Sequence, residues 1–426
     1  MNAVEGLVIE PDPAASLAAM RAWRDASAGV TMFGRPLCEW QADSRAALGL
    51  PTDVPIVLTG HQAAIWHAGI LAKWILTDAL ARAGRAAAAT IVVEQDENDG
   101  GDIAFPAVRD GLIRRAALPT LPSRRGGPTG LSRAVRIGPP EEEPVAAIAA
   151  PLGAIASAMN ARAGAANLAE QVSAANDELL RRRLGLDPPP SIMAGRLPDL
   201  PFARALIAGW SADPRARIAY AEALAIDPRA ARPLAPDELP VWRLRPGNPF
   251  GRREAVRTAD ALEPGLRLAP RAFLMTAIAR LVLADVFVHG TGGARYERVT
   301  EAWIRAWLGV GLAPMAVASA TIRLPIGPAP GAEPVVTRAG LRRRAFDPEA
   351  NGAGPSDSRK AFLAAIEAAP RRSAARRAAY RALVADRDRR RSGIAPELAR
   401  LAAEVERSRD RAASVDAGRS RSGSGR

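Results

Sequence analysis

Cysteine, histidine and lysine are the scarce side chains of this 426-residue sequence. It contains one cysteine and three histidines, and only Lys73 and Lys360 among its 58 basic residues are lysines. A single cysteine excludes an intramolecular disulfide and favours a reducing, cytoplasmic compartment. Because Cys38 has no histidine near it in the sequence, we expect a buried structural thiol rather than a catalytic nucleophile.

Long apolar stretches are also missing. No run approaches the roughly 20 uninterrupted apolar residues that a membrane-spanning helix needs, so we expect no membrane association. The start of the chain, MNAVEGLVIEPDPAA, is acidic and lacks the basic start and apolar stretch of a secretory signal. With 48% hydrophobic residues, the chain is long enough for two or three globular units.

The basic excess is concentrated towards the end of the chain. Residues 341–426 hold 21 basic and 11 acidic residues, a net charge of +10 out of the total of +13. Phosphate contacts could give such a segment affinity for nucleic acid. A solvated helical face explains the charge as well, and no nucleic-acid-binding motif accompanies it, so we do not expect a nucleic-acid partner.

Two of the three histidines stand in one turn between an expected strand and an expected helix. The stretch PIVLTGHQAAIWHAG, residues 55–69, starts with apolar residues of strand length and leads into an amphipathic segment over 70–83. The polar and glycine positions of this turn are Thr59, Gly60, His61, Gln62 and His67. Free amides and the dipole at a helix N-terminus can hold a phosphate or carboxylate in such a turn.

This turn is therefore a candidate nucleotide and catalytic site. We expect Thr59, Gly60 and Gln62 to bind a cofactor such as ATP or ADP, together with Lys73 one turn into the helix. His61 and His67 are candidates for acid–base catalysis near neutral pH. The alternative is that both histidines cap the helix or pack locally.

An acidic cluster follows the next expected strand, residues 89–93. The acids are Glu94, Asp96, Glu97, Asp99 and Asp102. Asp96 and Asp99 are candidate Mg²⁺ ligands, because magnesium favours carboxylates combined with phosphate oxygens. Asp96 is also a candidate catalytic residue that could bind a substrate amine. The spacing does not match a calcium-binding loop, and a solvated acidic loop would show the same pattern.

A glycine-rich turn follows another expected strand, residues 285–288. It reads HGTGG and precedes an expected helix over 294–307, so His289 and the amides of Gly290, Gly292 and Gly293 are candidates to hold a second part of the ligand. The turn matches no dinucleotide or Walker fingerprint, and the glycines could serve geometry alone. Because ligand crevices lie beyond the carboxyl ends of parallel strands, we expect His61 and His289 to meet over one cavity.

The alternation of strands and helices predicts an α/β fold. We expect a Rossmann-like parallel sheet core over residues 1–325, with an inserted segment around 119–257. A proline-rich linker over 326–357 leads to a helical region over 358–413 and a disordered tail over 414–426. Apolar residues recur at helical spacing in this region, which favours a short coiled coil and a homodimer; they are Leu398, Leu401 and Val405.

Three of these stretches resemble the bacillithiol biosynthesis cysteine-adding enzyme family. They are the strand with its TGHQ turn (59–62), the strand ending in the acids of 94–99, and HGTGGARYERV with the later SATIRL (289–299 and 319–324). The resemblance implies a nucleotide-binding Rossmann-type core, inserted connecting segments and a C-terminal coiled coil that pairs subunits. It also implies a ligase that joins cysteine to glucosaminyl-malate, a sugar–malate conjugate, through an amide.

The sequence departs from that family in both turns. The family usually has glutamine where His61 stands, and a shorter glycine turn without His289. Besides nucleic-acid binding by the basic C-terminal segment, which is the least expected, two functions stay open. One is a ligase that condenses an amino acid with a sugar-derived acceptor with the help of a nucleotide. The other is a nucleotide- or small-molecule-binding protein without catalysis.

Overall fold

The computed structural model describes residues 4–96, 102–109, 112–119, 127–247, 251–258, 266–322, 324, 356–370, 373–390 and some single positions between 392 and 403. The chain divides into two units, residues 1–327 and 328–426. Most of the expected linker, all of the expected disordered tail, and the expected coiled-coil positions Leu398, Leu401 and Val405 lie outside the described residues.

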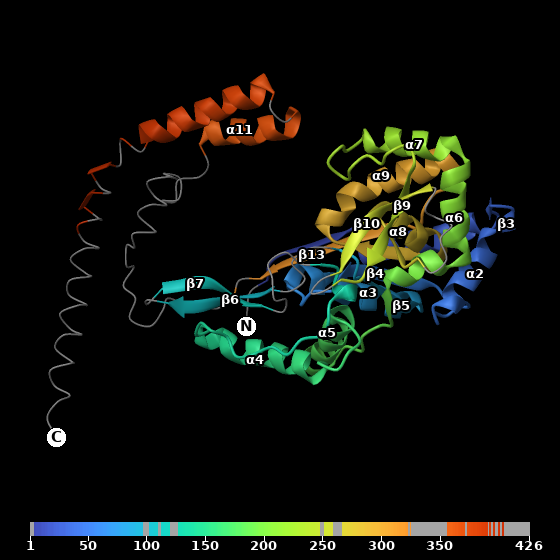
Figure 1. Cartoon of the computed structure of the whole chain (residues 1–426), viewed down its shortest axis with the longest axis horizontal. Coiled ribbons are helices and arrows are strands. Elements are labelled where there is room, and N and C mark those ends of the chain that lie inside the picture. Colours follow the sequence, from blue (N-terminus) through green and yellow to red (C-terminus); the bar gives the residue numbers. More distant parts are fainter. Residues whose placement is uncertain are drawn as a thin grey trace. The chain divides into compact units, whose positions relative to one another are not determined.

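A six-stranded sheet forms the centre of the first unit (Figure 1). In spatial order its strands are β1 (Val4–Glu10), β13 (Met315–Ile322), β12 (Val286–His289), β4 (Ile56–Gln62), β5 (Ala87–Val93) and β8 (Ser191–Met193). All neighbours pair in parallel except β1, which runs antiparallel to β13. The expected α/β fold with a mostly parallel sheet is confirmed. Because β8 comes from the segment expected as an insertion, that segment also contributes to the main sheet.

Helices cover both faces of this sheet. The α-helices of the first unit are α1 (Pro13–Ser27), α2 (Leu37–Ala47), α3 (Ala68–Gly84), α4 (Ala146–Ala161), α5 (Leu168–Leu184), α6 (Pro201–Ala212), α7 (Pro214–Leu224), α8 (Ala272–Ile278) and α9 (Thr291–Leu308). On one face, Val57 and Val288 pack with Met20 of α1 and Leu76 of α3. On the other face, the alternate strand residues join a larger core with α2, α6, α8 and α9. Burial of both faces explains why β4 and β12 read as continuous apolar runs.

Three smaller sheets complete the described part of this unit. Their strands are β2 (Thr31–Met32) with β3 (Arg35–Pro36), β6 (Asp102–Arg109) with β7 (Leu112–Pro119), and β9 (Glu238–Arg245) between β10 (Arg252–Arg257) and β11 (Leu268–Pro270). Short 3₁₀ segments occur at η1 (Thr129–Leu131) and η2 (Ala194–Asp199). The β6–β7 hairpin packs on α4 and α5 through a separate core, and these elements lie together in Figure 1.

The chain order of the sheet changes direction between β4 and β12. From β4 the chain adds β5 and β8 on one side, and later β12 and β13 on the other. Val288 pairs with Thr59, so His289, the last residue of β12, lies near the same edge of the sheet as Gly60 and the end of β4 at Gln62. A ligand crevice is expected at such a switch point, beyond the carboxyl ends of the strands.

Cys38 is exposed, so the expectation of a buried thiol is wrong. It lies at the start of α2, where Leu37 and Trp40 supply the buried contacts, and its own side chain faces solvent. Among the described residues, no helix has the length and apolar character needed to cross a bilayer.

The second unit contains helices in its described part. They are α11 (Asp357–Ala368) and a helix over 374–390, and the rings of Phe362 and Tyr380 lie 5.6 Å apart between them. None of the described residues within these two helices is buried. The expected C-terminal helices are confirmed for these residues, whereas coiled-coil packing is not seen among them.

Candidate functional site

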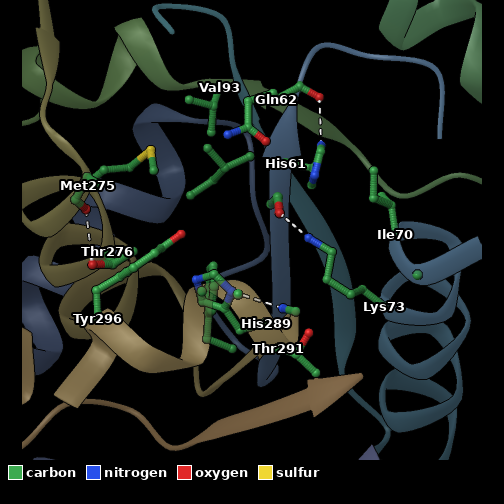
Figure 2. A pocket seen from close by; sticks show the side chains of 18 of the residues that line it. His61, Gln62, Ile70, Lys73, Val93, Met275, Thr276, His289, Thr291 and Tyr296 are labelled. Atoms are coloured by element: carbon green, nitrogen blue, oxygen red, sulfur yellow. Dashed lines mark hydrogen bonds between the residues drawn. The ribbon is translucent and has the colours of Figure 1, made fainter. Parts of the chain in front are cut away.

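A cavity of about 430 Å³ opens at the carboxyl ends of β4 and β12 (Figure 2). The sequence-predicted residues that line it are Gly60, His61, Gln62, His67, Lys73, Asp96, His289, Gly290, Gly292 and Gly293. The prediction that His61 and His289 share one cavity is confirmed. The cause is the parallel pairing of β4 with β12, which brings two strand ends that are far apart in the sequence to one edge of the sheet. The expected turn over residues 59–62 is therefore wrong, because β4 continues to Gln62.

Lys73 is buried in the wall of this cavity. It is only 3% exposed, and its Nζ donates a hydrogen bond of 2.6 Å to the carbonyl oxygen of Gly60. Figure 2 shows the side chain reaching from α3 towards β4. Among the described residues, no carboxylate forms an ion pair with it, and burial lowers the pKa of Lys73 to about 8. An anion in the cavity would therefore find a cation that lacks a counterion.

The two histidines at the strand ends are neutral near pH 7 in the free protein. Burial, followed by the charge of Lys73, lowers the pKa of His61 to about 4. Burial, followed by the charges of Lys73 and Arg280, lowers the pKa of His289 to about 3. Acid catalysis by His61 near neutral pH, as expected from the sequence, therefore requires a ligand that raises its pKa. A bound anion does this by compensating the positive charge of Lys73.

We expect the protein to lose stability in acid as these histidines become protonated. Their folded pKa values lie below the unfolded value of about 6.5, so between pH 6.5 and about 3 the unfolded state binds more protons. The free energy of unfolding should be greatest above pH 6.5 and decrease below it, by at most about 1.4 kcal/mol per unit of pKa shift. Urea unfolding at several pH values measures this decrease. A variant with His61→Asn and His289→Asn should show a shallower decrease, and an equal one contradicts the assignment.

His67 caps α3. Its Nδ1 accepts a hydrogen bond of 3.1 Å from the amide of Gly69, and its side chain is largely exposed. A Cβ on Gly69 would lie 3.0 Å from the His67 ring, so glycine allows the cap to close over the helix start. Helix capping is the alternative to catalysis that the sequence analysis gave for His67. Because Nδ1 is occupied, a catalytic role for His67 would have to use Nε2.

The glycines after His289 differ in the space that they leave for a side chain. A Cβ on Gly293 would lie 1.4 Å from Cε1 of His289, so this position must be glycine for the imidazole to lie over the first turn of α9. A Cβ on Gly292 would meet nothing within 4 Å. Gly290, the N-cap of α9, supplies no side-chain acceptor, which leaves the first amides of the helix available to a ligand.

Among the described acids of the cluster, Glu94, Asp96 and Asp102, only Asp96 lines the cavity. Its carboxylate accepts hydrogen bonds from Gln62 Nε2 at 3.2 Å and Arg253 Nη1 at 2.9 Å. Glu94 is buried and accepts hydrogen bonds from the Ala194 and Gly195 amides, at the start of η2. Asp99 lies outside the described residues. Within the described residues, no group of three metal-ligating side chains could hold an ion.

Thr59 lies in the sheet instead of in the cavity wall. It is fully buried, and its hydroxyl donates to the Val288 carbonyl oxygen at 2.8 Å, so the expected cofactor contact is not seen.

Thr59→Val removes this hydrogen bond between β4 and β12, and we expect the substitution to lower the free energy of unfolding by about 1 kcal/mol. The affinity of the Thr59→Val variant for an anionic ligand should match that of the wild type. Urea unfolding and ligand titration measure both quantities, and a tenfold loss of affinity would instead support the cofactor contact.

Sequence reasoning missed several residues around the cavity. Figure 2 shows Met275, Thr276 and Tyr296 on the opposite side of the cavity from Lys73. Behind this wall, Arg280 of the π-helix η4 (Ala279–Leu283) is buried and binds the carboxylate of Glu297 at 2.6 Å. A signal for this pair was present, because Arg280 is the one charge in the apolar stretch AFLMTAIARLVL and a buried arginine needs an acid.

The sequence matches no protein-family model, and no curated protein is significantly similar to it.

Proposed function

We propose that this protein is an enzyme whose cavity binds the anionic part of a nucleotide or small substrate. The observation that carries the proposal is the buried Lys73 ammonium, which has the Gly60 carbonyl oxygen beside it but no described carboxylate. A buried charge without a counterion is costly, and function is a common reason to keep one. A phosphate or carboxylate would supply the missing charge and would also face the N-termini of α3 and α9.

We further propose carbon–nitrogen ligase chemistry, as in the bacillithiol biosynthesis cysteine-adding enzymes. The TGHQ stretch at the end of β4 and the HGTGG stretch between β12 and α9, which carry the resemblance, contribute to the wall of the cavity. In this chemistry the nucleotide activates a carboxyl group as an acyl phosphate or acyl nucleotide. An amine attacks its carbon, the carbon–oxygen bond to that phosphate or nucleotide breaks as the amide forms, and the amine loses a proton. A neutral imidazole, that of His61 or His289, can accept that proton, and Lys73 with the helix amides can stabilise the charged oxygens.

The substrates follow from the same resemblance. We propose that the carboxyl group of an amino acid, cysteine, is joined to the amine of a sugar–malate conjugate, the acceptor, with ATP or ADP bound by a Rossmann-like core. The topological switch point between β4 and β12 supports this placement, because nucleotides in open α/β sheets bind at such points.

Calorimetric titration and a product assay test this proposal together. We expect ATP or ADP to bind the wild-type chain, and mass spectrometry to detect an amide product from cysteine and glucosaminyl-malate. A variant with His61→Asn and His289→Asn should keep its circular dichroism spectrum and lose turnover. If neither the nucleotides nor the sugar–malate conjugate binds, the proposal is wrong.

A binding protein without catalysis is the second candidate. Asp96 is occupied by Gln62 and Arg253, and the low pKa values of His61 and His289 leave neither imidazole charged at pH 7 in the free protein. Nucleotide binding without any product, over a set of amino acids and acceptors, would favour this candidate over the ligase.

We also propose that the C-terminal helices pair two copies of the chain. Leu363 on α11 and Tyr380 on the helix over 374–390 are both more than half exposed. Exposed apolar side chains that lie together mark contact sites between proteins. Leu363→Glu should convert a dimer into a monomer in size-exclusion chromatography with light scattering. Two results would contradict this proposal: a monomeric wild-type chain, or an unchanged dimer in the variant.

A further inference from the structure

We infer that Glu297 is a positioning residue for His289 and becomes its counterion when an anionic ligand occupies the cavity. The inference rests on the proposed anion site. It goes beyond that proposal by assigning a role to a residue outside the cavity wall, and by predicting that the ligand binds together with a proton.

Glu297 is buried directly behind His289. Its side chain is fully buried on α9, and Oε2 accepts a hydrogen bond of 2.6 Å from Arg280 Nη1. The other oxygen, Oε1, has no hydrogen-bond partner among the described residues and lies 3.8 Å from Nε2 of His289. An unpaired carboxylate oxygen in a protein interior is costly, so its proximity to an imidazole nitrogen calls for an explanation.

The hydrogen bonds of His289 determine which nitrogen carries the proton. The Gly290 amide donates to Nδ1 at 3.0 Å, so Nδ1 must be the unprotonated nitrogen. The ring proton is therefore on Nε2, which is the nitrogen nearest Glu297. The ring is confined by the close approach of Gly293 and by the aromatic rings of Phe287 and Tyr296, at 5.4 and 5.8 Å. Glu297 thus stabilises one tautomer of a ring that has little room to turn.

The charges around His289 come from four neighbouring elements. Lys73 on α3 and Arg280 on η4 oppose its protonation, as does His61 on β4 whenever that ring is charged. Glu297 on α9 favours its protonation, but shares its negative charge with Arg280. Arg280 is also bound to Glu301 at 2.5 Å, so one guanidinium serves two carboxyl groups. Burial raises the pKa of Glu297, and the charge of Arg280 opposes this rise. Tyr296, which also contacts the ring, has its pKa raised by burial and stays neutral.

An anionic ligand changes this balance. It compensates the Lys73 charge, and its oxygens compete with Nδ1 for the Gly290 amide. Nδ1 can then take up a proton and donate to the ligand, while Nε2–H stays directed at Glu297. The pair becomes an imidazolium with a buried counterion, and ligand binding takes up a proton.

Long-range ¹⁵N spectra of the histidine rings test the inference. The full chain has three histidines, and His289→Asn assigns the signal of interest. The probe ligand is inorganic pyrophosphate. At pH 7 we expect a neutral Nε2–H ring in the free wild type and an imidazolium at saturating pyrophosphate. In Glu297→Gln, Arg280 should hold the amide oxygen and turn the NH₂ group towards Nε2, so the free ring should shift towards the Nδ1–H tautomer and stay neutral with ligand.

Glu301→Gln is the matched control. Glu301 also binds Arg280, but its side chain is 40% exposed. This variant should behave like the wild type, and circular dichroism should show that both variants are folded. The inference is overturned if Glu297→Gln leaves the His289 tautomer and its protonation unchanged, or if Glu301→Gln changes them equally. If pyrophosphate does not bind the wild type, the anion site fails, and the tautomer of the free protein still decides the role of Glu297.

Discussion

Lys73→Met should lose affinity for anionic ligands by on the order of 100-fold or more, because a buried charge-assisted contact is worth several kcal/mol when its partner is removed. The methionine is unbranched and as long as the apolar stem of the lysine, and it lacks the ammonium at the cavity. Calorimetry with ATP and with pyrophosphate measures the loss. The control is Lys360→Met, which replaces the other lysine of the sequence at an exposed position beside Asp357 and should bind like the wild type.

The same substitution should make the protein more stable. The pKa of Lys73 falls from 10.5 to about 8 on folding, a penalty on the order of 3 kcal/mol that is fully present below pH 8. Loss of the hydrogen bond to the Gly60 carbonyl offsets about 1 to 2 kcal/mol of the gain. Wild-type stability should rise between pH 8 and 10.5 relative to that of the variant. A variant that loses both affinity and stability would indicate a structural role for Lys73.

Gly293→Ala should lower activity and ligand affinity by at least about 100-fold, because a 1 Å misplacement at a site can cost that much. A Cβ at this position would occupy the space of the His289 ring, so the imidazole must leave its place beside Glu297 and Gly290. The start of α9 is otherwise compatible with alanine, so the fold should persist. Ligand titration, the product assay and the His289 ¹⁵N signal all measure the effect.

Gly292→Ala is the matched control for this prediction. It adds the same methyl group one residue earlier in the same helix turn, where a Cβ would meet nothing within 4 Å. Gly292 also lines the cavity, but a Cβ there would leave the His289 ring in place, so we expect a clearly smaller loss of affinity and activity than in Gly293→Ala. Equal losses in the two variants would mean that the turn tolerates no added side chain for reasons unrelated to His289.

Much of the site could be predicted from local sequence. An apolar strand that ends in glycine and histidine directs those residues to the carboxyl edge of a parallel sheet, and two such strands must share that edge. This reasoning placed His61 and His289 in one cavity, and the scarcity of lysine drew attention to Lys73. These predictions succeeded because each depends on strand direction and helix starts, which neighbouring residues determine.

The rest depends on contacts between distant parts of the chain. Thr59 reads as part of a ligand turn, but its side chain points along the sheet to Val288, which the sequence does not reveal without the strand order. Asp96 is held by Arg253 from a separate small sheet. Cys38 was misplaced because its side of α2 depends on which residues the core accepts. The pairing of Glu297 with Arg280 likewise requires α9 to pack on η4.

A crystal structure with bound ATP or pyrophosphate tests the central claim most directly. We predict that phosphate oxygens lie within hydrogen-bond distance of Lys73 Nζ and of the first amides of α9, and that Lys73 turns from the Gly60 carbonyl to the ligand. A phosphate bound elsewhere, with Lys73 still directed at Gly60, would contradict the account.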